Sequence, residues 1–305
     1  MNLHKEQTKL KKEMKRLLFL VNPGAGTGDP RELEEVIKKQ FGETGTEFRI
    51  HYLDEDDPLA QAGKLIQQIE PDTVVAAGGD GTINMVATAI LGKGINLGIL
   101  PAGSSNGLAY ELGIPTDFEE AVSTVAAGNL KALDALMIND RHLCLHLSDL
   151  GLNARVVRRY DHEGIRGFYG YARQYFRELT NRKKFRCEVK TGKEVHRRKC
   201  VMVIMANGSF YGTGASVTPD GKPDDGLFKV ILIDAYPFWF LFYMLISIFT
   251  RRFNDSRFRK IIQCREAMIQ VEPSQELQSD GEHIGRESEV SVRLLEACIN
   301  LISGK

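Results

Sequence analysis

Three short apolar runs in the first third of the chain each end in a glycine-rich stretch, and a helix pattern follows each stretch. The runs are residues 17–21, 73–77 and 97–100. Continuous apolar runs of this length are typical of strands covered on both faces, and their alternation with helices predicts right-handed crossovers in a mostly parallel sheet. Because ligands bind such sheets at the carboxyl ends of the strands, the glycine stretches are expected at one edge.

The central stretch, residues 78–82, has the sequence Gly-Gly-Asp-Gly-Thr. Its three glycines allow the main chain to approach an anionic ligand, Thr82 offers a hydroxyl, and the next helix points its N-terminus into the same space. Asp80 would be repelled by phosphates unless it bound a cation or a proton, which points to metal-assisted phosphoryl transfer. An Asp-Gly turn with a helix cap is the alternative interpretation.

The two flanking stretches are less specific when taken singly. Residues 22–28, Asn-Pro-Gly-Ala-Gly-Thr-Gly, match neither the Walker pattern nor Gly-x-Gly-x-x-Gly, and a plain turn explains them equally well. Residues 101–109, Pro-Ala-Gly-Ser-Ser-Asn-Gly-Leu-Ala, again open a helix. Three such stretches after strands of one sheet favour a phosphate-binding site over three unrelated turns.

The length of 305 residues favours two domains. From about residue 144 the sequence is rich in strand patterns without regular helices, which predicts an antiparallel sheet or sandwich. We therefore expect a basic extension at residues 1–15, a Rossmann-like α/β nucleotide-binding domain at 16–140, and a C-terminal antiparallel β-sandwich domain with inserted helices at 141–305. The last strand of the second domain can return to the first.

Charge and cysteine content exclude several classes of protein. The chain has 40 basic and 40 acidic residues, so its overall field gives no argument for nucleic acid, and no nucleic-acid partner is expected. The five cysteines are scattered and none forms a Cys-x-x-Cys pair, which argues against a disulfide framework and a zinc site. A reducing cytoplasm fits this usage best.

The three glycine stretches, in their order and spacing, resemble the catalytic domain of the diacylglycerol kinase, sphingosine kinase and bacterial lipid kinase family. The resemblance extends through residues 208–227 and the late triplet Asp280-Gly281-Glu282. It implies a two-domain kinase that uses ATP and Mg²⁺. NAD kinases share the central motif, but the Pro-Ala-Gly-Ser loop and the Asp-Gly-Glu triplet are similar to lipid kinases.

The resemblance also implies which residues contact ATP. They are Asn22, Pro23, Gly24, Ala25, Gly26, Asp54, Gly78, Gly79, Asp80, Gly81, Thr82, Ile83, Asn84, Met85 and Ser104. Two positions depart from the family pattern. Many bacterial members have an acid where this chain has Gly107, and there it joins acids matching Asp80 and Asp134 in a network of water and magnesium. Members often have a threonine where this chain has Asp54.

The late triplet is implied to supply the group that accepts a proton from a lipid hydroxyl. Phosphoryl transfer needs one acid oriented on the nucleophile, and the resemblance gives this role to Glu282, with Asp280 and Asp80 nearby. The sequence does not decide which acid acts directly. Taken alone, the triplet is interpreted as a solvated turn.

A structural magnesium site is implied at a second acidic turn. Family members bind the ion through a carbonyl at Lys222, the carboxylate of Asp225 and a carbonyl at Leu227, a donor set that suits a hard cation. The residues by themselves favour a hairpin turn with a spare acid.

The most apolar segment, residues 236–249 from Tyr236 to Phe249, is shorter than a bilayer span. A buried helix of the second domain is one interpretation. The other is a peripheral contact with the membrane that holds the lipid substrate. Nearby basic residues are candidates for the same contact: Arg155, Arg158, Arg159 and Arg173.

The expected function is therefore that of a cytoplasmic, peripherally membrane-associated lipid kinase of phospholipid biosynthesis. It would transfer the γ-phosphate of ATP to a hydroxyl of a membrane lipid such as diacylglycerol or a sphingoid base. The alternatives are a NAD kinase-like enzyme and a non-catalytic regulator that binds nucleotide or lipid. The identity of the lipid and the formation of a homodimer stay open.

Overall fold

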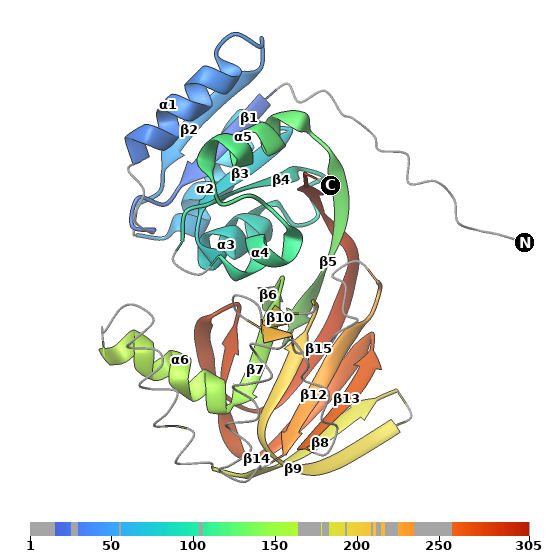
Figure 1. The fold of residues 1–305 in the computed structure, drawn as a ribbon. Coiled ribbons are helices and arrows are strands. Elements are labelled where there is room, and N and C mark those ends of the chain that lie inside the picture. Colours follow the sequence, from blue (N-terminus) through green and yellow to red (C-terminus); the bar gives the residue numbers. More distant parts are fainter. Residues whose placement is uncertain are drawn as a thin grey trace, which may run out of the picture. The chain divides into compact units, whose positions relative to one another are not determined.

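The computed structural model of the chain describes residues 16–25, 30–54, 56–103, 106–163, 178, 183–192, 194–208, 210–211, 215–216, 225–234 and 258–304 (Figure 1). The chain divides into two compact units. Unit 1 comprises residues 1–133 and 298–305, and unit 2 comprises residues 134–297. Two strands, β5 (Leu130–Ile138) and β15 (Glu282–Ile302), carry the chain from one unit into the other. The expected combination of an α/β part and a β-rich part is confirmed.

The sheet of unit 1 has the order β2-β1-β3-β4, followed by the end of β15. Its first four strands are β1 (Arg16–Val21), β2 (Glu47–Tyr52), β3 (Thr73–Gly78) and β4 (Asn96–Pro101). All neighbouring pairs in this order are parallel. The last strand joins β4 through Asn300 and Leu301, which lie opposite Asn96 and Leu97.

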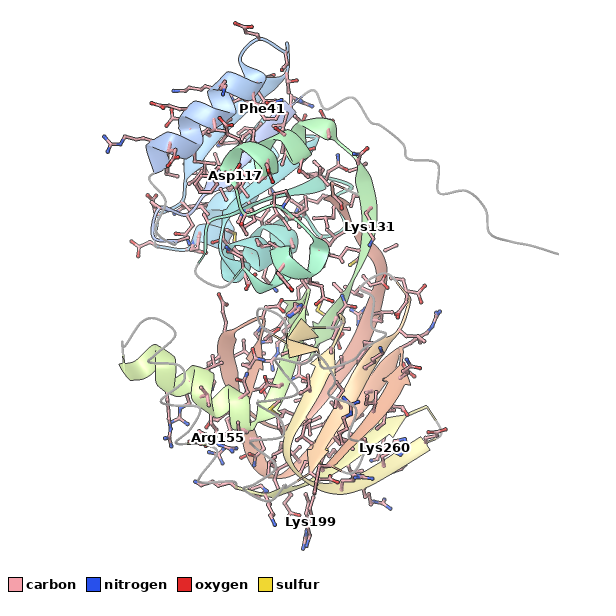
Figure 2. The ribbon with its side chains drawn as sticks, in the orientation of Figure 1. Phe41, Asp117, Lys131, Arg155, Lys199 and Lys260 are labelled. Atoms are coloured by element: carbon pink, nitrogen blue, oxygen red, sulfur yellow. The ribbon has the colours of Figure 1, made fainter. Side chains whose placement is uncertain are left out.

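The helices described in unit 1 are α1 (Pro30–Phe41), α2 (Pro58–Ile69), α3 (Asp80–Ile90), α4 (Gly107–Leu112) and α5 (Phe118–Ala127). Two of them, α2 and α5, begin at an aspartate whose side chain caps the helix. The Asp57 carboxylate accepts the Ala60 N–H at 3.1 Å before α2, and the Asp117 carboxylate accepts the Glu120 N–H at 3.0 Å at the start of α5 (Figure 2). Each such cap stabilises its helix by about 1 kcal/mol.

Helices cover both faces of this sheet, which explains its uninterrupted apolar strands. On one face, α1 and α5 pack on alternate residues of β1. The Phe19 ring lies 5.8 Å from Phe41 of α1 and 6.4 Å from Phe48 of β2. The intervening residues Leu18 and Leu20 are also fully buried, and α2 packs against α3 and β1. Burying one phenylalanine side chain contributes about 2 to 3 kcal/mol.

Unit 2 is built from antiparallel strands. The order β13-β12-β9-β7-β14-β15 runs through it, β8 pairs with both β9 and β14, and β5 pairs with β6. The strands, besides β5 and β15, are β6 (His142–Cys144), β7 (Leu147–Gly151), β8 (Phe185–Thr191), β9 (Glu194–Ala206), β12 (Phe228–Asp234), β13 (Arg259–Cys264) and β14 (Glu266–Ser279). A separate short pair is β10 (Phe210–Tyr211) with β11 (Ala215–Ser216).

Two features of unit 2 differ from the sequence-based expectation. The helix α6 (Leu152–Glu163) follows β7 directly, where no helix was predicted. The helix expected at residues 168–179 lies outside the described residues apart from Glu178. The triplet 280–282, interpreted by itself as a solvated turn, is the tip of a long hairpin of β14 and β15, in which Asp280 and Gly281 lie between the strands. Three polar residues of this hairpin, Gln275, Glu276 and Gln278, are buried, although their polarity favoured exposure to solvent.

Within the described residues, none of the helices combines the length and apolar character needed to cross a membrane. The apolar segment at 236–249 lies outside those residues.

Candidate active site

The three glycine stretches follow β1, β3 and β4, which are adjacent strands, and backbone hydrogen bonds continue the sheet into them. The Asn22 N–H donates to the Ala77 carbonyl at 2.9 Å, and the Ala102 N–H donates to the Gly78 carbonyl at 2.9 Å. The carboxyl ends of these parallel strands therefore place the stretches side by side, in a position typical of ligand sites in parallel sheets.

The second and third stretches touch through glycine. A Cβ atom built on Gly79 would lie 3.3 Å from the Gly103 Cα, and a Cβ on Gly103 would collide with the Gly79 Cα. A Cβ on Gly78 would lie 2.6 Å from the Thr82 Cβ. Close packing thus requires these three glycines. Because they have no side chains, they do not cover the backbone at the start of α3.

Asn22 links the first stretch to α3. Its side-chain N–H group donates to the Thr82 hydroxyl at 3.0 Å, and its side-chain oxygen accepts the Gly24 N–H at 3.0 Å. Asn22 therefore fixes the direction of the first loop and the rotamer of Thr82 at the same time. A hydroxyl and several backbone N–H groups form a donor set that suits phosphate oxygens.

Asp80 holds the beginning of α4. One oxygen of its carboxylate accepts the Gly107 N–H at 2.9 Å and the other accepts the Leu108 N–H at 3.1 Å. Asp80 itself lies in the first turn of α3. The carboxylate therefore connects the starts of two helices, and Gly107 contacts it through the backbone.

The remaining predicted nucleotide residues lie along the same segments. Pro23 is exposed, Ile83 is fully buried, and Asn84 and Met85 are half-buried. Asp54 is exposed at the end of β2, where its N–H donates to the Gln61 side-chain oxygen at 3.1 Å. Gly26 and Ser104 lie outside the described residues.

In unit 2, Asp280 and Gly281 form the tight turn between β14 and β15. Both have positive φ, 47° and 90°, as a two-residue hairpin of the primed type requires. The Asp280 carboxylate accepts three backbone N–H groups at the start of β7: those of Leu145 at 2.8 Å, His146 at 3.0 Å and Leu147 at 2.9 Å. These bonds occupy lone pairs on both oxygens, so the carboxylate fixes this segment to the hairpin.

A thiol adds to the same carboxylate. The Cys144 Sγ lies 3.4 Å from Asp280 Oδ1. Burial raises the pKa of the Cys144 thiol well above its usual range, and the adjacent negative charge of Asp280 raises this pKa further. The thiol therefore stays protonated and can donate to Asp280.

Glu282 differs from Asp280 in its exposure. It begins β15 directly after the turn, opposite Ser279, and is exposed, whereas Asp280 is half-buried. Of the two acids in the triplet, Glu282 is thus the more accessible to an incoming molecule. The late triplet contains one acid that holds the fold and one that faces solvent.

Asp134 and the second acidic turn are also connected. The buried Asp134 carboxylate accepts the Ala297 N–H at 2.7 Å and the Gly226 N–H at 3.0 Å. The exposed Asp225 carboxylate accepts the Leu227 N–H at 3.1 Å. Lys222 lies outside the described residues, and in the described part of the chain no group of three or more His, Cys, Asp or Glu side chains could hold a metal ion.

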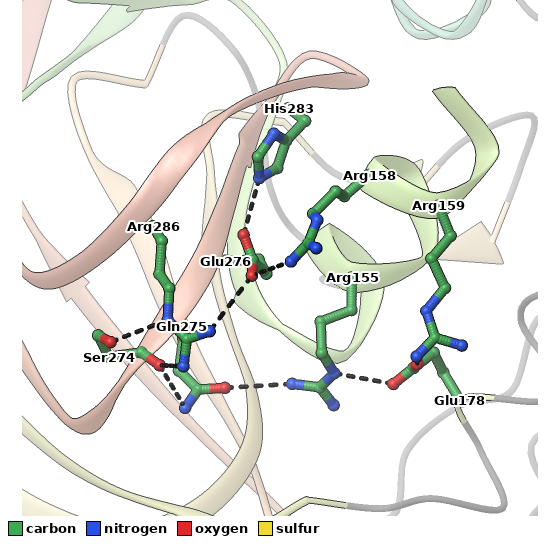
Figure 3. A network of polar contacts seen from close by, with 9 residues as sticks. All are labelled: Arg155, Arg158, Arg159, Glu178, Ser274, Gln275, Glu276, His283 and Arg286. Atoms are coloured by element: carbon green, nitrogen blue, oxygen red, sulfur yellow. Dashed lines mark hydrogen bonds and ion pairs between the residues drawn. The ribbon is translucent and has the colours of Figure 1, made fainter. Parts of the chain in front are cut away.

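The arginines considered for membrane contact are bound to acids beneath α6 (Figure 3). Arg155 and Arg159 both pair with the buried Glu178, at 2.8 and 2.9 Å, and only 12% of the Arg155 side chain is exposed. Arg158 pairs with the buried Glu276 at 2.5 Å and is about half exposed. Of these three, Arg158 is the most available to a partner. Arg173 lies outside the described residues.

Glu276 of β14 also binds His283 and Arg286 of β15, at 2.9 and 3.5 Å (Figure 3). Burial raises the pKa of Glu276, but the hydrogen bonds from His283 and Arg158 outweigh burial and leave this pKa below its usual value. The ionised carboxylate therefore joins α6 to both strands of the hairpin that bears Glu282.

Sequence reasoning missed several residues that shape these sites. Asn106, in the left-handed region with φ 48°, accepts the Gly103 N–H at 2.9 Å; the Asn106-Gly107 pair was the available signal, because asparagine tolerates this conformation. Asp149 and Gln278 of unit 2 bond to each other at 2.5 Å although they are far apart in sequence, and no local pattern identifies them.

Comparisons with known proteins agree with this two-part organisation. Residues 16–138 match the family described as the diacylglycerol kinase catalytic domain. Residues 148–303 match the family described as the YegS C-terminal NAD kinase beta sandwich-like domain.

Similar proteins occur in several bacteria. An uncharacterized protein of Synechocystis, sll0036, is 26% identical over 306 residues, which cover 93% of this chain and 69% of that protein. A protein of Klebsiella pneumoniae described as a probable lipid kinase YegS-like is 29% identical over 216 residues, covering 69% of this chain and 71% of its own. A putative diacylglycerol kinase from Bacillus anthracis, of known crystal structure, covers 96% of this chain and 99% of its own with a TM-score of 0.79. At 22% identity, the last likeness shows the fold.

Proposed function

We propose that this chain transfers the γ-phosphate of ATP to a hydroxyl of a membrane lipid. The premise is that the chain belongs to the lipid kinases that combine a diacylglycerol kinase catalytic domain with a YegS-type C-terminal domain. Membership makes the chain a phosphotransferase with an alcohol group as acceptor. The nucleotide contacts, the proton acceptor, the metal and the class of lipid are the parts proposed here.

The observation that carries the proposal is the packing of Gly79 against Gly103. It brings two loops of adjacent strands together without side chains between them, and Asn22 and Thr82 close the same edge. Backbone N–H groups, a hydroxyl and the N-terminus of α3 are together suited to the phosphates of ATP. Asp80 would keep this edge in shape through α4 rather than contact phosphate.

Glu282 is proposed as the group that accepts the proton of the lipid hydroxyl. Its exposure supports this role, since a general base must come within hydrogen-bond reach of the substrate. Asp280 is proposed to position the hairpin, because its oxygens already accept backbone N–H groups and a thiol.

Mg²⁺, when bound with ATP, supplies neutralisation of the phosphate charge. The donors described at the glycine loops are mainly N–H and hydroxyl groups, which fit phosphate oxygens better than a cation, so the ion would be held by ATP and water. Asp225, an exposed carboxylate beside a tight turn, fits a single ligand of a separate structural ion.

A peripheral membrane contact is proposed to bring the enzyme to its substrate. The candidates for this contact are Arg158 of α6 and the apolar segment at 236–249. We propose this contact because the substrate is dissolved in a bilayer.

The test is a transfer assay with radiolabelled ATP, Mg²⁺ and separate samples of diacylglycerol, sphingosine, ceramide, phosphatidylglycerol and NAD. We expect turnover on a lipid, and a loss of about a hundredfold or more in kcat for Glu282→Gln. Glu289→Gln, on the same strand and also exposed, is the matched control and should retain activity.

Other outcomes assign the alternatives. Turnover on NAD alone would indicate a NAD kinase. ATP binding without turnover on any acceptor would indicate a non-catalytic regulator. Wild-type turnover by Glu282→Gln would refute the proposed proton acceptor.

A further inference from the structure

The turn that precedes Glu282 is bound from inside unit 2 by one glutamine. Gln278 lies on β14, and its side chain is 1% exposed. Its side-chain oxygen accepts the Gly281 N–H at 2.9 Å. This bond is made to the residue directly before Glu282, in a turn whose two residues have positive φ.

The other end of the Gln278 amide is held by a buried acid. The Nε2 group donates to Asp149 Oδ2 at 2.5 Å, and Asp149 lies directly opposite Gln278 on the neighbouring strand β7. Asp149 is fully buried, so its charge requires strong donors. The Gln278 backbone is held too, because its carbonyl accepts the Ser148 hydroxyl at 2.6 Å.

Asp149 is in turn fixed by the first turn of α6. Its Oδ1 accepts the Ala154 N–H at 2.9 Å, and its Oδ2 accepts the Asn153 side-chain N–H at 2.7 Å. A continuous chain of hydrogen bonds therefore runs from the start of α6 through Asp149 and Gln278 to the Gly281 backbone. Every step between side chains in this chain is buried.

We propose that Gln278 is a positioning residue for the proposed kinase reaction, and that it fixes the backbone from which the Glu282 carboxylate reaches the acceptor hydroxyl. The inference rests on the proposed function of Glu282. Chemistry explains the choice of residue: the site needs a donor toward Asp149 and an acceptor toward Gly281 at the same time. A neutral amide supplies both, whereas an ionised carboxylate supplies no donor.

This requirement gives a test through two variants. Gln278→Met keeps the length of the side chain and removes both bonds. Gln278→Glu keeps both bonds only while the new carboxyl is protonated, when its O–H donates to Asp149 and its carbonyl accepts from Gly281. Burial beside Asp149 favours the protonated form, and rising pH removes the proton.

Ionisable residues occur on all the elements around Gln278, so the comparison is made as a ratio to the wild type at each pH. They are Asp149 on β7, Arg155 and Arg158 on α6, Glu276 on β14, Asp280 in the turn, and Glu282 and His283 on β15. Gln263→Glu, at an exposed position of β13, is the control for adding one carboxyl.

The first measurement is kcat on the lipid that the wild type phosphorylates. Gln278→Met should lower kcat by about ten- to a hundredfold at every pH, with the KM for ATP within about twofold. For Gln278→Glu, the ratio of kcat to the wild-type value should rise as pH falls from about 9 to about 6. The same ratio for Gln263→Glu should stay constant. A ratio for Gln278→Glu that does not change with pH would overturn the inference.

The second measurement is hydrogen exchange of the Gly281 amide, which needs no activity. Loss of its acceptor should speed exchange at least tenfold in Gln278→Met. In Gln278→Glu, the ionised carboxylate loses its bond to Asp149 and is repelled by that acid, which pushes it away from the Gly281 N–H, so the acceleration relative to the wild type should grow with pH. Unchanged protection in both variants would also overturn the inference. If the wild type phosphorylates no acceptor, the proposed function is refuted. Hydrogen exchange still tests whether Gln278 holds the turn through the Gly281 N–H.

Discussion

Asp80 of unit 1 and Asp280 of unit 2 each precede a glycine, and each binds a neighbouring segment of backbone. They differ in the number of hydrogen bonds that the carboxylate accepts. Asp80 begins a helix and accepts two N–H groups, one on each oxygen, from the first turn of α4. Asp280 has a left-handed backbone in a hairpin and accepts three N–H groups and a thiol. Both aspartates of the predicted catalytic motifs therefore accept hydrogen bonds from backbone N–H groups.

The difference lies in what surrounds each carboxylate. Around Asp80, close contacts between glycines keep side chains away from the loop edge, so unit 1 presents mainly backbone groups there. Around Asp280, backbone N–H groups of residues 145–147 and the buried Cys144 thiol supply the connections, and the exposed acid is Glu282, two residues later. This contrast supports the proposal that unit 1 binds the anionic nucleotide and that unit 2 accepts the proton.

The largest expected effect distinguishes the two aspartates by stability. Asp280→Asn turns one acceptor oxygen into a donor among several donors, and it should lower the free energy of unfolding by about 3 kcal/mol. Asp80→Asn should cost about 1.5 kcal/mol, because it loses one helix-capping bond and part of the favourable interaction with the α4 dipole.

Urea titrations of both variants measure the difference. Equal costs would contradict the view that Asp280 is the more heavily engaged of the two. Glu282→Gln serves as the control and should change stability by less than about 0.5 kcal/mol, since it is exposed.

The next effect concerns the glycine contact on the Asp80 side. Gly103→Ala should cost about 2 kcal/mol, because its Cβ would collide with the Gly79 Cα and push the two loops apart. We also expect weaker ATP binding, measured by calorimetry. Gly63→Ala is the matched control: its Cβ would meet no atom within 4 Å and it lies inside α2, so the substitution should be neutral or stabilising. A similar loss in both variants would remove the special status of Gly103.

The smallest effect is a dependence of stability on alkaline pH on the Asp280 side. Above about pH 9 the unfolded chain releases the Cys144 proton whereas the folded chain retains it, since the pKa of this thiol is raised in the folded state. Stability should therefore fall as pH rises, by up to about 1.4 kcal/mol per pH unit from this thiol.

Cys144→Ser should flatten this fall while preserving a donor to Asp280. Burial also raises the pKa of Cys264, to about 12, so part of the slope should persist in the variant. Unfolding titrations at several pH values test this expectation. An identical slope in the variant and the wild type would show that Cys144 makes no contribution.

The sequence was most informative where structure depends on nearby residues. Helix α5 has a local signal at each end, because Asp117 caps its start and Gly128, with φ 64°, ends it. The glycine stretches likewise predict the turns that follow their strands. Helix α6 was missed because the acid that binds its first turn, Asp149, lies within β7 and not at the usual capping position.

The roles of the acids depend on tertiary pairing, which local patterns do not contain. Asp280 binds residues more than 130 positions earlier in the chain. Gln278 and Glu276 have the polarity of surface residues, but the strand and helix that cover them lie far away in sequence. Sequence could therefore indicate the late triplet, and the structure was needed to separate Asp280 from Glu282.

The position of β15 makes the order in which the two units are completed differ from the order in which they are begun. Residues 298–304 are synthesised after the contiguous residues 134–297 of unit 2, yet their Asn300 and Leu301 pair with β4 of unit 1. Limited proteolysis of nascent chains stalled before and after this segment emerges would measure the delay. Unit 1 is therefore completed only after unit 2 has been synthesised, and until then β4 offers an open edge to other proteins in a crowded cell.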